Sequence, residues 1–202
     1  MTQNEDFARF RYDESGKIAL FAVADGMGNL DYGLIVSRMV VDTILGHMDF
    51  LEDNDKKSFI LNTLEMADYE LEKFCEKNKC RSGVSIAFGL IHDRELTFSW
   101  QGNVRIYLND TRDWNQITSD HILHIGNGKY RLSRCLKGEG LRDDIPVVTI
   151  AFGHCNKLIA CTDGLYKICS SLDSMENIIL SGAFPEDISK PIDDCTGLLI
   201  EF

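Results

Sequence analysis

The order of the apolar segments is the feature that most constrains the fold. Two strand patterns come first, over residues 7–12 and 18–24, and the second stops abruptly at Asp25-Gly26. Two helical patterns follow, with apolar residues at three- and four-residue steps, the first over 32–48. Most of the remaining chain reads as short strands with hairpin-length links. This order predicts an α+β fold of antiparallel sheets covered by helices, rather than repeated parallel crossover units.

The length indicates one domain. A chain of 202 residues can form one hydrophobic core, and no internal repeat or linker divides it. We therefore expect a single domain over 1–202. Further strand patterns cover 83–91, 96–100, 104–108, 147–152, 157–161 and 197–202, and a weaker helical pattern covers 174–180.

Composition argues against several classes of partner. The net charge is -11 and the basic residues do not form a stripe, so we expect no nucleic-acid partner. No apolar run reaches the ~18 residues of a membrane span, and the N-terminus lacks the pattern of a signal peptide. Seven cysteines without a CxxC pair indicate free thiols in a reducing compartment. We expect a cytoplasmic monomer that does not bind membranes.

Short acidic motifs stand at the edges of several of these strands. Each alone reads as a turn or a solvated strand end, because Asp-Gly is a common turn dipeptide. Together they suggest a divalent-metal site, since carboxylates from separate strands are a usual way to supply oxygen ligands to Mg²⁺ or Mn²⁺. The motifs are Asn4-Glu5-Asp6, Asp25-Gly26, Asp163-Gly164 and Asp193-Asp194.

Eight motifs that include these residues follow one another in a familiar order. They are NED, FAVADGMGN, SGVSIAFGL, GNVRIYL, ITSDHI, LSRCLK, LIACTDGLY and DDCTGLLIEF. Their sequence resembles the PPM-type (type 2C) metal-dependent serine/threonine protein phosphatases, especially bacterial ones, from residue 4 to residue 202. The resemblance implies a four-layer sandwich, in which two antiparallel β-sheets are flanked by α-helices on both outer faces.

The resemblance also implies a site and a reaction. Asp25 would bridge two Mn²⁺ or Mg²⁺ ions, with Glu5 or Asp6 and the Gly26 carbonyl serving one of them. Asp163 and Asp193 would serve the other ion. Asp25 and Asp163 would be the catalytic pair, because the ions they hold activate the water that attacks phosphorus without a covalent intermediate. Phosphoserine or phosphothreonine in phosphoproteins is the implied substrate, and a serine/threonine kinase the implied counterpart.

The sequence departs from the family pattern in places that leave other functions open. The arginine that usually clamps the substrate phosphate is replaced by Met1, and an aspartate for a third ion is replaced by Asn103, which keeps an oxygen ligand but lacks the charge. The segment that forms the substrate flap is nearly absent. One alternative is therefore a pseudophosphatase or regulatory binding module with little turnover. Another is hydrolysis of a small phosphorylated molecule.

Overall fold

A computed structural model describes most of the chain. The described residues are 4–13, 17–27, 30–51, 55–110, 113–126, 129–142, 144–153, 157–184 and 193–201. The expected clamp position, Met1, lies outside them.

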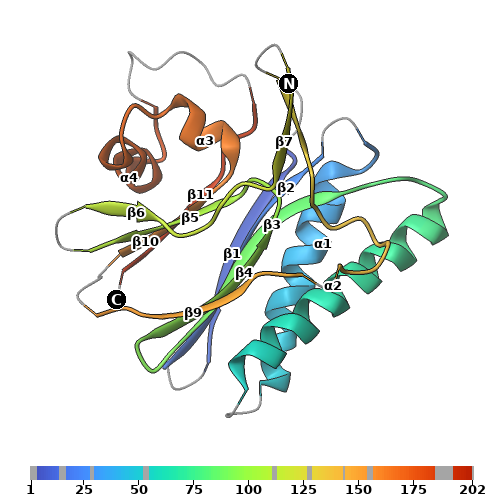
Figure 1. Ribbon diagram of the computed structural model, residues 1–202, viewed down its shortest axis with the longest axis horizontal. Coiled ribbons are helices and arrows are strands. Elements are labelled where there is room, and N and C mark those ends of the chain that lie inside the picture. Colours follow the sequence, from blue (N-terminus) through green and yellow to red (C-terminus); the bar gives the residue numbers. More distant parts are fainter. Residues whose placement is uncertain are drawn as a thin grey trace.

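Most of the described elements form two antiparallel sheets and two helical layers (Figure 1). The first sheet has the order β1 (Asp6–Tyr12), β2 (Ile18–Gly26), β3 (Val84–His92), β4 (Glu95–Gln101) and β9 (Val147–Ala151). The second has the order β11 (Gly197–Glu201), β10 (Lys157–Cys161), β5 (Arg105–Asn109) and β6 (Trp114–Gln116). The helices are α1 (Gly33–Gly46), the 3-10 turn η1 (His47–Phe50), α2 (Lys56–Asn78), α3 (Asp163–Ile168) and α4 (Leu172–Ser181).

Alternation along β2 explains why its apolar run is continuous. Leu20 and Ala22 pack with α1 and α2, whereas Phe21 and Val23 pack between the two sheets. Successive side chains of a strand point to opposite faces, so a strand that is covered on both sides needs apolar residues at every position. The next residue on the inter-sheet face is Asp25, which places its carboxylate at the end of the sandwich.

A third apolar cluster covers the outer face of the second sheet. Tyr107 and Ile159 of the sheet pack there against Leu165 of α3 and against Met175 and Ile178 of α4. Together with α1 and α2 on the opposite side, these helices complete the four-layer sandwich and confirm the predicted fold class (Figure 1). None of the described helices combines the length and apolar character that a membrane span requires.

Among the differences from the sequence-based expectation, two concern segments close to the acidic motifs. After β10 the chain enters the short helix α3, with Asp163 as its first residue, where a tight turn was expected. The segment expected to lack a flap contains the strands β7 (Ile122–Gly126) and β8 (Lys129–Leu132), which form a two-stranded hairpin. Both elements are short, and their position depends on distant parts of the fold, so local pattern alone did not indicate them.

Candidate active site

Asp25 lies where three strands bring acidic and polar residues side by side. In the register of the first sheet, Asp25 pairs with Asp6 of β1 on one side and with Ser85 of β3 on the other. Directly paired residues of antiparallel strands point to the same face. Asp25 therefore shares the inter-sheet face with a second carboxylate and a hydroxyl group.

The two Asp-Gly pairs bring further acidic segments close, because neither glycine has space for a side chain. A Cβ at Gly26 would lie 2.8 Å from the backbone oxygen of Glu5, and a Cβ at Gly164 would lie 1.9 Å from that of Asp194. The Gly26 N–H donates a hydrogen bond to the Glu5 carbonyl, at 3.2 Å. Glycine is needed at both positions because the opposing backbone passes so close.

The acidic segments open on one shared cavity of about 540 Å³. The predicted site residues in its lining are Glu5, Asp25, Gly26, Asp163 and Asp193. They come from segments far apart in the sequence, and Asp194 and Ser85 join them. The fold thus brings together the acidic motifs that the sequence analysis singled out.

Asp6 is the exception among the predicted ligands. Its side chain is 6% exposed and is not part of the cavity lining, and its Oδ2 accepts a hydrogen bond from Thr162 Oγ1 at 2.7 Å. Of the two alternatives for the same role, Glu5 is the residue that lines the cavity. The backbone N–H of Glu5 donates to Asp194 Oδ2 at 2.6 Å, which ties the start of β1 to the segment before β11.

Negative charge is concentrated on the Asp25 side of the cavity. Burial, reinforced by the charges of Asp6, Asp163 and Asp193, raises the pKa of Asp25 to about 8. Burial likewise raises the pKa of Asp6 to about 7. The pKa of Glu5 is also raised, first by burial and then by the charges of Asp194 and Asp193. A carboxylate whose pKa is raised in this way is stabilised either by taking up a proton or by binding a cation.

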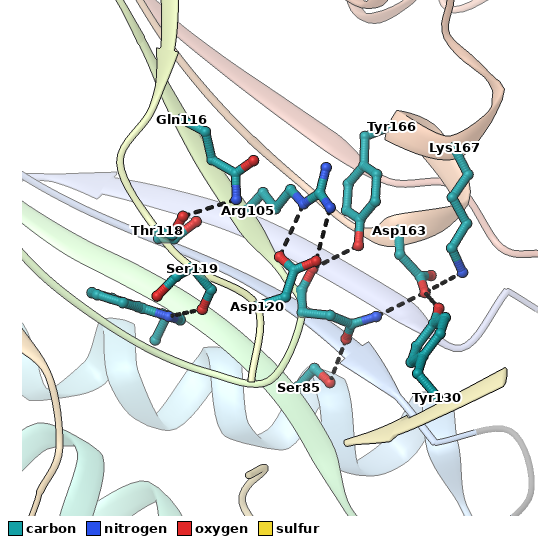
Figure 2. Close-up of polar contacts among 12 residues, drawn as sticks. Ser85, Arg105, Gln116, Thr118, Ser119, Asp120, Tyr130, Asp163, Tyr166 and Lys167 are labelled. Carbon is teal, nitrogen blue, oxygen red and sulfur yellow. Dashed lines mark hydrogen bonds and ion pairs between the residues drawn. The ribbon is translucent and has the colours of Figure 1, made fainter. Parts of the chain in front are cut away.

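The Asp163 carboxylate has a different environment (Figure 2). Its Oδ2 accepts hydrogen bonds from Asn103 Nδ2 at 2.7 Å, Tyr130 OH at 3.2 Å and Lys167 Nζ at 2.6 Å. The amide oxygen of Asn103 accepts a hydrogen bond from Ser85 Oγ at 3.0 Å. The amide of Asn103 thus presents its NH₂ group to Asp163, because a carboxylate accepts hydrogen bonds.

Arg105, Asp120 and Tyr166 form a polar cluster (Figure 2) that holds Asn103 in place. The Arg105 guanidinium donates two hydrogen bonds to Asp120, at 2.9 and 2.8 Å, and lies over the Tyr166 ring with its central carbon 3.7 Å from the ring centroid. The Tyr166 hydroxyl donates to the Asn103 carbonyl at 3.2 Å. A bidentate pair stacked on an aromatic ring restricts both side chains, so this cluster fixes the loop after β4.

The two sides of the cavity offer different donors to a divalent cation. On one side, Asp25, Glu5 and the Gly26 backbone offer hard oxygen atoms around excess negative charge, as Mg²⁺ or Mn²⁺ requires. On the other side, Asp163 already contacts an ammonium group. Within the described residues, no three carboxylate, imidazole or thiol groups stand close enough together to form a complete metal cage.

Comparison with known sequences finds distant relatives. No family model matches the chain. It is 27% identical over 126 residues to the protein phosphatase PhpP of Streptococcus pneumoniae, an alignment that covers 60% of this chain and 51% of PhpP. The alignment therefore spans about half the length of the curated relative.

Comparison with solved structures extends over nearly the whole chain. The serine/threonine phosphatase Stp1 of Staphylococcus aureus superposes with a TM-score of 0.80 at 17% identity, covering 99% of this chain and 89% of Stp1. The fold is that of a type 2C serine/threonine phosphatase. The serine/threonine phosphatase PstP of Mycobacterium tuberculosis agrees, with a TM-score of 0.71 at 21% identity over 88% of this chain and 80% of PstP.

Sequence reasoning missed several residues at the cavity of this type 2C fold. Tyr130 and Lys167 contact Asp163, and the exposed cationic residues Arg131 and Lys137 line the cavity. The spacing of Lys167, four residues after Asp163, was a usable signal, because residues four apart on a helix are neighbours. It went unused because no helix was expected there. The other three belong to or follow the unexpected β7–β8 hairpin.

Proposed function

We propose that the chain hydrolyses phosphoserine and phosphothreonine in phosphoproteins at a divalent-cation centre built on Asp25. The observation that carries this proposal is the shared cavity, into which Glu5, Asp25 and Asp193 bring carboxylates from distant segments. The serine/threonine phosphatase fold and the similarity to the distant relative PhpP, a protein phosphatase, support it. A divalent ion bound there would lower the pKa of water and offset the negative charge that develops on the phosphoryl oxygens.

The residues of this chain have separate roles in the proposal. Asp25 supplies the central carboxylate ligand, and its burial keeps bulk water from competing for the same charge. Glu5 and the Gly26 carbonyl complete that side of the centre. Arg131 and Lys137 line the same cavity with exposed cationic side chains, so they are suited to bind the phosphoryl oxygens of the substrate.

The proposed substrate class has an implied counterpart. A serine/threonine kinase must supply the phosphorylated side chains. The alternative of a regulatory module without turnover receives no support from the comparisons, whose matches cited above are named as phosphatases. Hydrolysis of a small phosphorylated molecule is a second outcome that a substrate comparison can detect.

The direct test is metal-dependent turnover of an aryl phosphate and of a phosphopeptide. The wild-type chain should hydrolyse both with Mn²⁺ and neither in excess chelator. Asp25→Asn should reduce kcat/KM by on the order of 10³-fold, because the central ligand charge is lost. Asp42→Asn is a matched control, since Asp42 forms surface ion pairs with Arg9 and Arg38 and lies outside the cavity lining.

The outcomes separate the candidate functions. Equal rates for Asp25→Asn and wild type would reject the centre. Absence of turnover in a folded wild-type protein that still binds Mn²⁺ would favour the regulatory alternative. Turnover of small phosphate esters without turnover of the phosphopeptide would favour a small-molecule substrate.

A further inference from the structure

The helical geometry of α3 explains why Lys167 lies beside the Asp163 carboxylate. It lies four residues after Asp163 on α3, the spacing at which two helical side chains meet. Its ammonium nitrogen is 2.6 Å from Asp163 Oδ2, and the Asp163 side chain is only 10% exposed. Figure 2 shows the lysine directed at this carboxylate from the α3 side. The sequence therefore places a permanent cation on one of the expected metal ligands.

The same carboxylate oxygen has no capacity left for a metal ion. Oδ2 accepts from Lys167, Asn103 and Tyr130, whereas a carboxylate oxygen offers about two lone-pair directions. A second divalent ion would have to use the other oxygen with an ammonium group close by. Like charges at such short range repel strongly when water is partly excluded.

Lys167 also acts electrostatically on the rest of the centre. Its charge lowers the pKa of Asp25 against the larger opposing effects of burial and the neighbouring carboxylates. The ammonium group lies 5.3 Å from the centroid of the Tyr130 ring, an arrangement that favours a cation over the aromatic face. The ammonium group therefore faces both the Asp163 carboxylate and the Tyr130 ring.

We propose that Lys167 is a built-in cation that occupies the Asp163 side of the centre in place of a second divalent ion. The chain then has one tight divalent-ion site, formed by Glu5, Asp25 and the Gly26 carbonyl. The inference rests on the proposed metal centre but goes beyond it, because it concerns how many ions bind and which residue limits that number.

The test is the number of Mn²⁺ ions bound, measured by isothermal titration calorimetry and by electron paramagnetic resonance. Wild type should bind one ion under conditions that saturate the tight site. Lys167→Met keeps the length of the side chain without its charge, and should bind a second ion at least about tenfold more tightly than wild type does. Two Mn²⁺ ions ~3.5–4 Å apart should then give a spin-coupled signal that wild type lacks.

Three further variants test whether the charge of Lys167 is what limits the number of bound ions. Lys167→Arg retains the cation and should keep the wild-type stoichiometry. Lys167→Gln supplies a second neutral side chain if the methionine variant folds poorly. Lys73→Met is the matched control, because Lys73 pairs with Glu70 one turn earlier on α2 and lies outside the cavity lining.

Each result has a defined consequence. Two ions of similar affinity in wild type would overturn the role of Lys167 and leave the metal centre intact. One ion in wild type and an unchanged count in both neutral variants would also overturn it, because another feature would then limit the number. No Mn²⁺ binding by any variant would reject the inference and the proposed centre together.

Discussion

Asp25 and Asp163 have the same local sequence context and opposite electrostatic environments. Asp25 is the second-last residue of β2 and Asp163 lies two residues after the end of β10, and each precedes a glycine that packs against another acidic segment. Asp25 is surrounded by carboxylates, and its pKa is raised to about 8 by burial and by those charges. Asp163 contacts a lysine, a tyrosine hydroxyl and an amide NH₂ group.

The difference shows that an Asp-Gly pair at a strand end determines where the carboxylate lies but not what it binds. The glycine allows a distant backbone to approach, but the partners that approach decide whether the carboxylate needs a cation. Among the described residues, no ion pair balances the carboxylates on the Asp25 side, so a divalent ion is the expected partner. On the Asp163 side the chain supplies its own cation.

The largest expected effect is on activity. Asp25→Asn should lower the Mn²⁺-dependent kcat/KM by on the order of 10³-fold, whereas Asp163→Asn should lower it by only about tenfold. The reason is that Asp163 already has its charge balanced by Lys167. Steady-state kinetics on an aryl phosphate measures both. A loss of kcat/KM for Asp163→Asn as large as that for Asp25→Asn would contradict the different roles assigned to the two carboxylates.

The next effect is on stability and concerns the two glycines. A Cβ at Gly164 would collide with the Asp194 carbonyl, and one at Gly26 with the Gly33 and Glu5 carbonyls. We expect each alanine variant to lower the free energy of unfolding by roughly 2–3 kcal/mol, with Gly164→Ala the more severe. Gly46→Ala is the control, because its Cβ meets nothing within 4 Å. Urea denaturation with equal costs for all three would contradict the close backbone approach.

A third effect concerns pH in the metal-free protein. The folded pKa of Asp25 is about 8 because burial and its neighbours disfavour the charge, so the folded state holds a proton that the unfolded state releases near pH 4. Stability should therefore fall as pH rises from about 4 to 8. In chelator at pH 8, Asp25→Asn should raise the free energy of unfolding by on the order of 2 kcal/mol.

Replacing the Asp163 carboxylate should change the free energy of unfolding in the opposite direction. Asp163→Asn should lower stability at the same pH, since it leaves the Lys167 charge without its partner. Denaturation curves at pH 5 and pH 8 measure both variants. An identical pH dependence for wild type and Asp25→Asn would contradict the assignment of this charge to Asp25.

The smallest expected effect is that of Tyr130→Phe, which tests whether a neutral hydrogen bond to Asp163 matters as much as the charge of Lys167. Tyr130→Phe removes a neutral donor at 3.2 Å and should lower the free energy of unfolding by less than about 1 kcal/mol. Its Mn²⁺ stoichiometry should match wild type, unlike that of Lys167→Met. A second ion bound by Tyr130→Phe would mean that the hydroxyl group, and not the ammonium group, limits metal binding.

Much of the fold could be predicted because its signals are local. The continuous apolar run before Asp25 belongs to a strand covered on both faces, and the periodic stretch over 32–48 belongs to a packed helix. The acidic motifs could be predicted as a group because each stands at the end or start of a strand. Single-domain organisation and the assignment of metal ligands stay predictions.

The remaining features depend on contacts between distant segments. The direction of the Asn103 amide is set by Ser85 and Asp163, which are 18 and 60 residues away. Lys167 contacts Asp163 because α3 begins at Asp163, and the sequence pattern did not predict this helix. Tyr130 lies on a hairpin of two short, largely exposed strands, which carry little periodic signal.

The most direct test of the central claim is a crystal structure of the chain soaked in Mn²⁺ and measured at a wavelength where manganese scatters anomalously. The account predicts one manganese peak within ligand distance of the Asp25 carboxylate and the Gly26 carbonyl, with Lys167 still on Asp163. A cavity without manganese beside Asp25 would contradict it.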